Sequence, residues 1–195
     1  MACLCQAPTL SAQSIEVTPF AGYRFGGDFF EIVTKQPVDL DGAPARGIAV
    51  DVPLSNGLQV EGFFTHQDAD VVTKARLFDG AKLWRITVDH WQGGGLQEFS
   101  SGRIRPFLTG TLGLTRYATE GDNEIRFSVG AGGGVKLFPL SHIGLRLESR
   151  VFTTFDDAEG RLIFCSSGSG TCAFAIHADL VWQAEFTAGL VVKFP

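Results

Sequence analysis

Apolar and polar residues alternate along most of this chain, and the clearest case is its last segment, residues 181–194. Every second position from Trp182 to Phe194 is apolar, whereas the positions between them are mostly polar or small. A period of two residues is typical of a β-strand with one apolar and one polar face. With an aromatic residue near the carboxyl end, the pattern predicts the closing strand of a transmembrane β-barrel.

Seven further segments alternate in the same way, at about 14–24, 46–54, 57–67, 82–92, 104–117, 124–138 and 143–155. The connections at 25–45, 68–81, 118–123 and 156–180 are mostly longer and polar, whereas those at 55–56, 93–103 and 139–142 are mostly shorter. Asn56-Gly57 favours a tight type I′ hairpin turn. The sequence therefore predicts an all-β fold, an eight-stranded antiparallel up-and-down transmembrane β-barrel with both termini at the short-turn end.

Charged residues help to identify which face of each strand would contact lipid, because an Arg or Lys that faces lipid at mid-bilayer costs about 2–4 kcal/mol. If the aliphatic phase of each strand faces lipid, the charges of the strands face inward. This predicts a lumen charge network of Glu16, Arg24, Asp51, Glu61, Arg85, Asp89, Arg105, Arg126, Lys136, Arg146, Glu148, Arg150, Glu185 and Lys193. Side chains fill the interior of an eight-stranded barrel, so we expect these charges to pair and to plug the lumen.

Aromatic residues on the apolar phase near strand ends are candidates for the membrane interfaces. Tyr23, Trp84, Trp182 and Phe194 meet this description, and Trp and Tyr are enriched at such interfaces. His66 and His90 also fall on the phase assigned to lipid.

Composition and length favour one domain, with the barrel at 14–195. No apolar run approaches the roughly 20 residues of a spanning helix. Residues 1–13 are interpreted as the remnant of a signal peptide or as a disordered leader. The net charge of −5 and the lack of a Lys/Arg cluster argue against nucleic-acid binding.

Two cysteines, Cys165 and Cys172, are separated by six residues rich in Ser and Gly. Such a spacer lets the two residues approach bonding distance, and we expect a loop disulfide in an oxidising compartment. A metal site would need further ligands, so no metal and no cofactor are predicted.

Several segments resemble the small outer-membrane β-barrel proteins of Gram-negative bacteria that are related to the OmpA transmembrane domain. They are 17–27 in the first strand, 105–107, 132–136 and 144–148 in the middle strands, and 181–190 before the terminal aromatic. The resemblance covers essentially Ser14 to Phe194, and Pro195 departs from the family's usual aromatic ending. It implies a location in the cell outer membrane with both termini in the periplasm, but not an activity, because the fold serves many functions.

Four functions agree with these patterns. The first is a non-enzymatic structural or interaction barrel whose loops, chiefly 25–45 and 156–180, meet an extracellular partner. The second is a narrow, anion-leaning pore for small solutes. A lipid-modifying enzyme would need a nucleophile and base at the rim, which the four histidines do not assemble. A soluble lipocalin-like ligand-binding barrel would invert every face, and alternation by itself leaves it open.

The first hypothesis carries its own expectations about partners. They are outer-membrane lipid around the barrel and the barrel-insertion machinery, which would act on the C-terminal strand. The protein itself is expected to be a monomer.

Overall fold

The computed structural model describes residues 14–26, 28–31, 37–40, 42–73, 81–119, 123–155, 161–165, 172–177 and 180–195. The leader predicted at 1–13 lies outside the described residues. Within the described part, no helix is long and apolar enough to cross a membrane.

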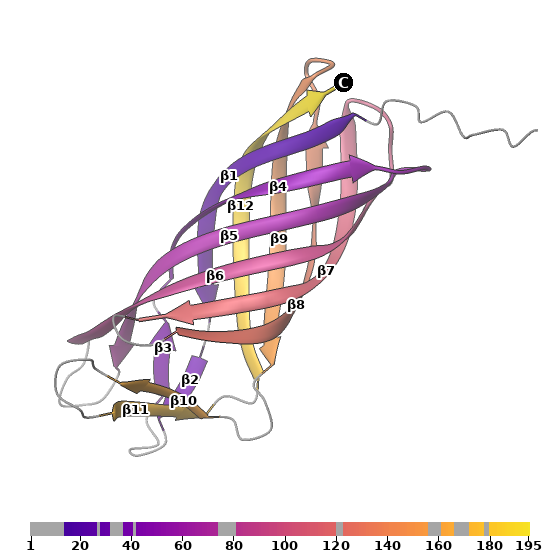
Figure 1. Ribbon diagram of the computed structural model, residues 1–195. Coiled ribbons are helices and arrows are strands. Elements are labelled where there is room, and N and C mark those ends of the chain that lie inside the picture. Colours follow the sequence, from indigo (N-terminus) through magenta and orange to yellow (C-terminus); the bar gives the residue numbers. More distant parts are fainter. Residues whose placement is uncertain are drawn as a thin grey trace, which may run out of the picture.

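Eight long strands in the described part form a closed antiparallel barrel (Figure 1). They are β1 (Ile15–Gly26), β4 (Ala43–Pro53), β5 (Leu58–Thr73), β6 (Ala81–Glu98), β7 (Ile104–Ala118), β8 (Asn123–Leu137), β9 (Ile143–Phe155) and β12 (Leu180–Phe194). Each pairs with its neighbours in the ring, and β12 pairs with β1 to close it. This confirms the predicted eight-stranded antiparallel barrel.

Four short strands of the described part extend the sheet at one end of the barrel. They are β2 (Asp28–Glu31), β3 (Pro37–Leu40), β10 (Arg161–Cys165) and β11 (Cys172–His177). β3 pairs with the far end of β5, and β2, β11 and β10 follow in that order. Figure 1 shows this group at the end opposite the carboxyl terminus. The connections 25–45 and 156–180, predicted as loops, therefore contain strand segments of their own.

Both described chain ends lie at the other end of the barrel, since Ile15 of β1 pairs with Phe194 of β12. The three short turns of the barrel lie there as well. Hydrogen bonds link them to neighbouring elements: the Glu98 amide donates to the Gly57 carbonyl, and the Lys193 amide donates to the His142 carbonyl. The longer connections lie at one end of the barrel and the short turns at the other, as predicted.

The apolar face of the barrel points outward. Leu108, Leu112, Leu147 and Phe186 are each about half exposed or more, at 47–62%. Charged side chains on the opposite phase are buried in the lumen, Glu16, Arg24 and Lys136 among them. A lipocalin-like barrel has the reverse arrangement, with its apolar residues inside.

Strand β6 departs from the predicted phase. Ile86, Val88 and His90 are at most 3% exposed and face the lumen, so Arg85 and Asp89 face outward. Their placement in the lumen network was wrong, as was the placement of His90 on the lipid face. The apolar residues of β6 pack inside the barrel, beyond its charged network. Arg85 and Asp89 lie between the outward apolar band and the short strands, so facing outward would not expose these charges to the hydrocarbon of a bilayer.

The hairpin between β4 and β5 has the predicted type I′ turn. Asn56 has a φ of 54° and Gly57 a φ of 79°. The Leu58 amide donates a hydrogen bond of 2.9 Å to the Ser55 carbonyl. Positive φ at both central residues is what this turn requires, and Asn and Gly adopt it most readily.

Replacing Gly57 by alanine is expected to lower the free energy of unfolding by about 1–3 kcal/mol, because a non-glycine residue is strained at positive φ. The added Cβ would also lie 2.4 Å from the Glu98 carbonyl oxygen. Denaturant unfolding in a fixed lipid measures the change. The control is Gly102→Ala, whose Cβ would approach nothing nearer than Ser100 Oγ at 3.5 Å. Equal effects of the two substitutions would contradict the role of the turn.

Candidate functional site: a charge-balanced lumen

Two arginines of β9 organise the middle of the lumen. Arg146 donates to Asp51 at 2.9 Å and to both Glu61 and Glu148. Arg150 contacts the same two glutamates, at 2.7 Å to Glu61 and 2.6 Å to Glu148. All five side chains are at most 6% exposed. A buried ion is tolerated only when partners neutralise it and fill its hydrogen-bonding sites, and here each arginine has at least two carboxylate partners.

Lys136 of β8 extends this network toward the short-turn end. Its ammonium group lies 2.7 Å from Glu16, 2.9 Å from Asp51 and 3.2 Å from Glu98, and it donates to the Gln59 amide oxygen at 2.9 Å. The side chain is fully buried. Asp51 therefore joins the lysine to the arginine pair through its shared carboxylate oxygen.

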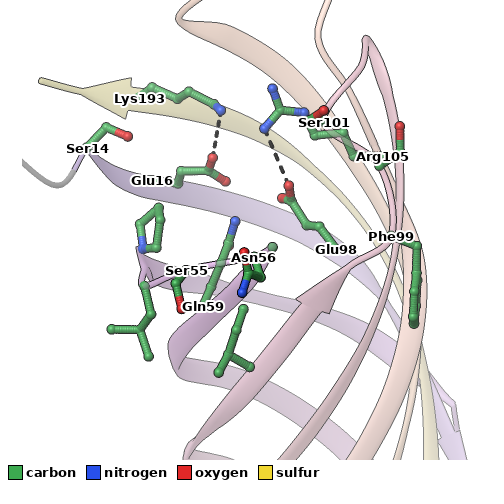
Figure 2. Close-up of a pocket in the computed structure, with 15 residues that line it drawn as sticks. Ser14, Glu16, Ser55, Asn56, Gln59, Glu98, Phe99, Ser101, Arg105 and Lys193 are labelled. Atoms are coloured by element: carbon green, nitrogen blue, oxygen red, sulfur yellow. Dashed lines mark hydrogen bonds and ion pairs between the residues drawn. The ribbon is translucent and has the colours of Figure 1, made fainter.

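The outermost members of the network lie at the short-turn mouth of the barrel (Figure 2). Lys193 contacts Glu16 at 2.8 Å, and Arg105 contacts Glu98 at 3.4 Å. These four side chains line a recess of about 550 Å³ that is open to the outside. Gln59 also lines the recess, and its amide oxygen accepts the hydrogen bond from the buried Lys136.

The connected network is electrically neutral within the described part of the chain. Its acids are Glu16, Asp51, Glu61, Glu98 and Glu148, and its bases are Arg105, Lys136, Arg146, Arg150 and Lys193. Five negative and five positive charges cancel. The lumen therefore holds a compensated cluster that spans strands on all sides of the barrel.

An aromatic layer covers the network on the side of the short strands. Phe20 stacks on Phe63 with ring centroids 4.9 Å apart, and Phe152 lies 6.1 Å from Phe63. All three are at most 8% exposed. The guanidinium of Arg150 lies 3.8 Å from the Phe63 centroid, a cation–π contact that joins the layer to the network.

A separate ion pair lies beyond this layer. Arg24 contacts Glu185 at 2.7 Å, and it donates to the Thr65 hydroxyl at 2.7 Å. The imidazole of His90 stacks on Phe152 at 4.1 Å and hydrogen-bonds Gln183 at 3.0 Å. The interior is thus layered, with ion pairs on both faces of the aromatic layer.

The fourteen residues predicted for the network fall into four groups. Nine belong to the connected cluster, Arg24 and Glu185 form the separate pair, Arg126 pairs with Glu124 at 3.2 Å, and Arg85 and Asp89 lie outside.

Sequence reasoning missed Glu98 because residues 93–103 were interpreted as a turn, whereas β6 continues to that residue. It also missed Glu124, which lies at the edge of its predicted strand. For Glu124 the signal was present, since it shares the inward phase of β8 with Arg126 and Lys136, whereas Glu98 lies on the phase of β6 that the sequence pattern assigned to lipid.

The aromatic residues predicted for the membrane interfaces face outward where their side chains are described. Tyr23, Trp182 and Phe194 are 48–57% exposed and point away from the lumen, as expected. For Trp84 only the backbone is described. Trp91, which the analysis of β6 missed, is 57% exposed, and its ring lies 4.3 Å from that of Phe64.

The predicted disulfide concerns the hairpin of β10 and β11. Cys165 and Cys172 are backbone partners in this ladder, which places the two residues opposite each other. Their side chains lie outside the described part, so the disulfide stays a prediction.

No protein-family model matches the chain, and no curated protein matches its sequence. Solved structures match its fold. Neisserial surface protein A superposes with a TM-score of 0.63 at 13% identity, covering 92% of this chain and 97% of that one. The outer membrane protein OprG from Pseudomonas aeruginosa gives 0.59 at 13% identity, covering 94% and 96%.

A major outer membrane protein from Thermus thermophilus gives a TM-score of 0.52 at 13% identity, covering 94% of this chain and 100% of that one. Sequence identities this low support a shared architecture but do not support a shared activity. The closure of eight strands, the outward apolar face and these matches agree: the chain has the fold of the eight-stranded outer-membrane β-barrels.

Proposed function

We propose that this protein is an integral outer-membrane barrel with a closed lumen, which acts as a structural or interaction protein through the end that carries the short strands. The observation that carries the proposal is the filled interior. Ten charges cancel within one network, eight of them on buried side chains, and three phenylalanine rings cover it. A pore of this width would need an open, hydrated path between these side chains.

The outer surface supports the location in a membrane. Exposed leucines on the outward phase of β7 and β9 form a band that would be costly to hydrate, and a closed barrel satisfies the backbone groups within a bilayer. In this arrangement both termini and the short turns face the periplasm. The insertion machinery would recognise the C-terminal strand, and a partner outside the cell would meet the segments 25–45 and 156–180.

The proposal includes no enzymatic activity and no cofactor. Ser141 contacts His142 at 2.9 Å, but these neighbours lie in a short turn, and among the described residues no carboxylate contacts that imidazole. His90 is fully buried beside Phe152. Neither histidine is placed with a nucleophile and a carboxylate at an accessible rim, which hydrolysis of a lipid ester would require.

The test is to refold the full chain in detergent micelles, compare boiled and unboiled migration on an SDS gel, and then record conductance in planar bilayers. We expect a heat-dependent shift in migration and no stepwise conductance. Stepwise conductance would contradict the closed lumen and support the narrow, anion-leaning pore. Solubility without detergent, together with unchanged migration, would contradict the membrane barrel itself.

A further inference from the structure

A row of charged side chains crosses the outside of four neighbouring strands. Arg46 of β4 is the ladder partner of His66 of β5, His66 is the partner of Asp89 of β6, and Asp89 is the partner of Arg116 of β7. Asp68 lies two residues beyond His66 on the same face. We call these five residues the outer charged row.

Four members of the outer charged row, His66, Asp68, Asp89 and Arg116, contact one another. His66 Nδ1 lies 2.7 Å from Asp89, and its Nε2 lies 3.4 Å from Asp68. Arg116 lies 3.6 Å from Asp89, and the Thr87 hydroxyl donates to Asp68 at 2.7 Å. Asp89 is only 6% exposed although it faces outward. These four side chains are therefore held in place by their mutual contacts and are not independent solvated charges.

The outer charged row directly adjoins the apolar band. Phe64 and Trp91 lie two residues from His66 and Asp89, on the same outward phase, and their rings pack against each other at a tilt of 43°. Two residues along a strand span about 7 Å, or about 5 Å along the axis of a barrel whose strands tilt by about 35–45°. The headgroup layer on each side of a bilayer is about 5–8 Å thick. The row therefore lies at headgroup depth if Phe64 and Trp91 mark the edge of the hydrocarbon.

The charges occupy one side of the barrel only. Among the described side chains, outward-facing charges on the long strands are confined to β4, β5, β6 and β7. Arg85 of β6 is exposed on the same face. The outer charged row is formally neutral, with two arginines and two aspartates, but Asp89 is buried, so the exposed charges of the row are Arg46, Arg116 and Asp68. These charges therefore form a patch on one side of the barrel and not a ring around it.

We propose that the outer charged row binds the phosphate headgroups of anionic lipids, whose acyl chains lie on the apolar band below Phe64 and Trp91. Arginine guanidinium groups match the geometry of phosphate and are weakly hydrated, so Arg46 and Arg116 are the residues that contact the headgroup. Asp89 is a positioning residue that orients Arg116. The inference rests on the proposed insertion of the barrel into a membrane.

Two tryptophans provide a comparison within one molecule. Trp91 adjoins the outer charged row, whereas Trp182 is equally exposed, at 57%, on β12, whose described outward side chains carry no charge. The variants W84F/W182F and W84F/W91F each keep one of them as a reporter. Both full-length proteins are refolded in phosphatidylcholine vesicles that contain either dibrominated phosphatidylglycerol or dibrominated phosphatidylcholine, and bromine quenching is measured at equal mole fractions.

We expect phosphatidylglycerol to be enriched about two- to fivefold over phosphatidylcholine at Trp91 and not at Trp182. The substitutions Arg46→Gln and Arg116→Gln together should abolish the enrichment, whereas Arg103→Gln, in an exposed turn at the other end, should preserve it. Equal quenching of Trp91 by both lipids would overturn the headgroup proposal and leave the row available to a protein partner. Absence of quenching at both tryptophans by either lipid would contradict membrane insertion and, with it, this proposal.

Discussion

Replacing Glu61 by glutamine is expected to lower the free energy of unfolding by about 3–5 kcal/mol, because removing one partner of a buried ion pair leaves the other charge uncompensated. Glu61 contacts both Arg146 and Arg150 and also accepts a hydrogen bond from Thr109 at 2.8 Å. Glutamine keeps the size of the side chain and removes only its charge. Urea unfolding in lipid vesicles, followed by gel migration, measures the loss.

A matched control is Glu124→Gln. Glu124 pairs with Arg126 at 3.2 Å, and both side chains are about a fifth exposed. Removal of a more solvated pair costs about 0–1 kcal/mol. A loss at Glu61 no larger than the loss at Glu124 would contradict the view that the network holds the barrel together.

The double variant E61Q/R150M tests whether charge balance is the cause. It removes one acid and one base, so the cluster stays neutral. We expect the double variant to lose less stability than the sum of the two single variants, since coupled charges in one network are not additive. Strict additivity would indicate that the two side chains act through packing alone.

Replacing Leu112 by arginine is expected to cost about 2–4 kcal/mol in a lipid bilayer, the penalty for a charge on the lipid face of a barrel. Leu112 lies in the interior of β7, where its ladder partners are Gly93 and Val129. It is 62% exposed, so the same substitution would have little effect on a barrel surrounded by water. Unfolding in vesicles of fixed composition provides the measurement.

Leu140→Arg is the control for this prediction. Leu140 is 61% exposed in the turn between β8 and β9, so its accessibility matches that of Leu112 while its depth differs. At or beyond the interface the cost falls to about 0–1 kcal/mol. Equal costs at the two positions would place the outer face of β7 in water and contradict the proposed location.

The sequence by itself determined the number of long strands, the turn at Asn56-Gly57 and the division of seven of these strands into an apolar and a charged face. These features depend on local rules: a period of two residues defines a strand, and the φ angles that Asn and Gly tolerate define the turn. In β9 the alternation of Leu145, Leu147 and Val151 with charged residues is unambiguous. Closing eight such strands into a barrel separates the two faces and pairs the backbone groups that an open sheet would leave at its edges.

The tertiary structure decided the phase of β6 and the partners of every charge. Ile86 and Val88 indicate a lipid-facing phase by their own chemistry, but the register with β5 places His66 beside Asp89 and Thr65 beside His90. That register turns the two apolar residues into the lumen and Asp89 to the outside. Alternation along a strand assigns residues to two faces. Pairing across strands decides which of the two faces is interior. It also decides how the ten network charges compensate one another and where the outer charged row meets the edge of the apolar band.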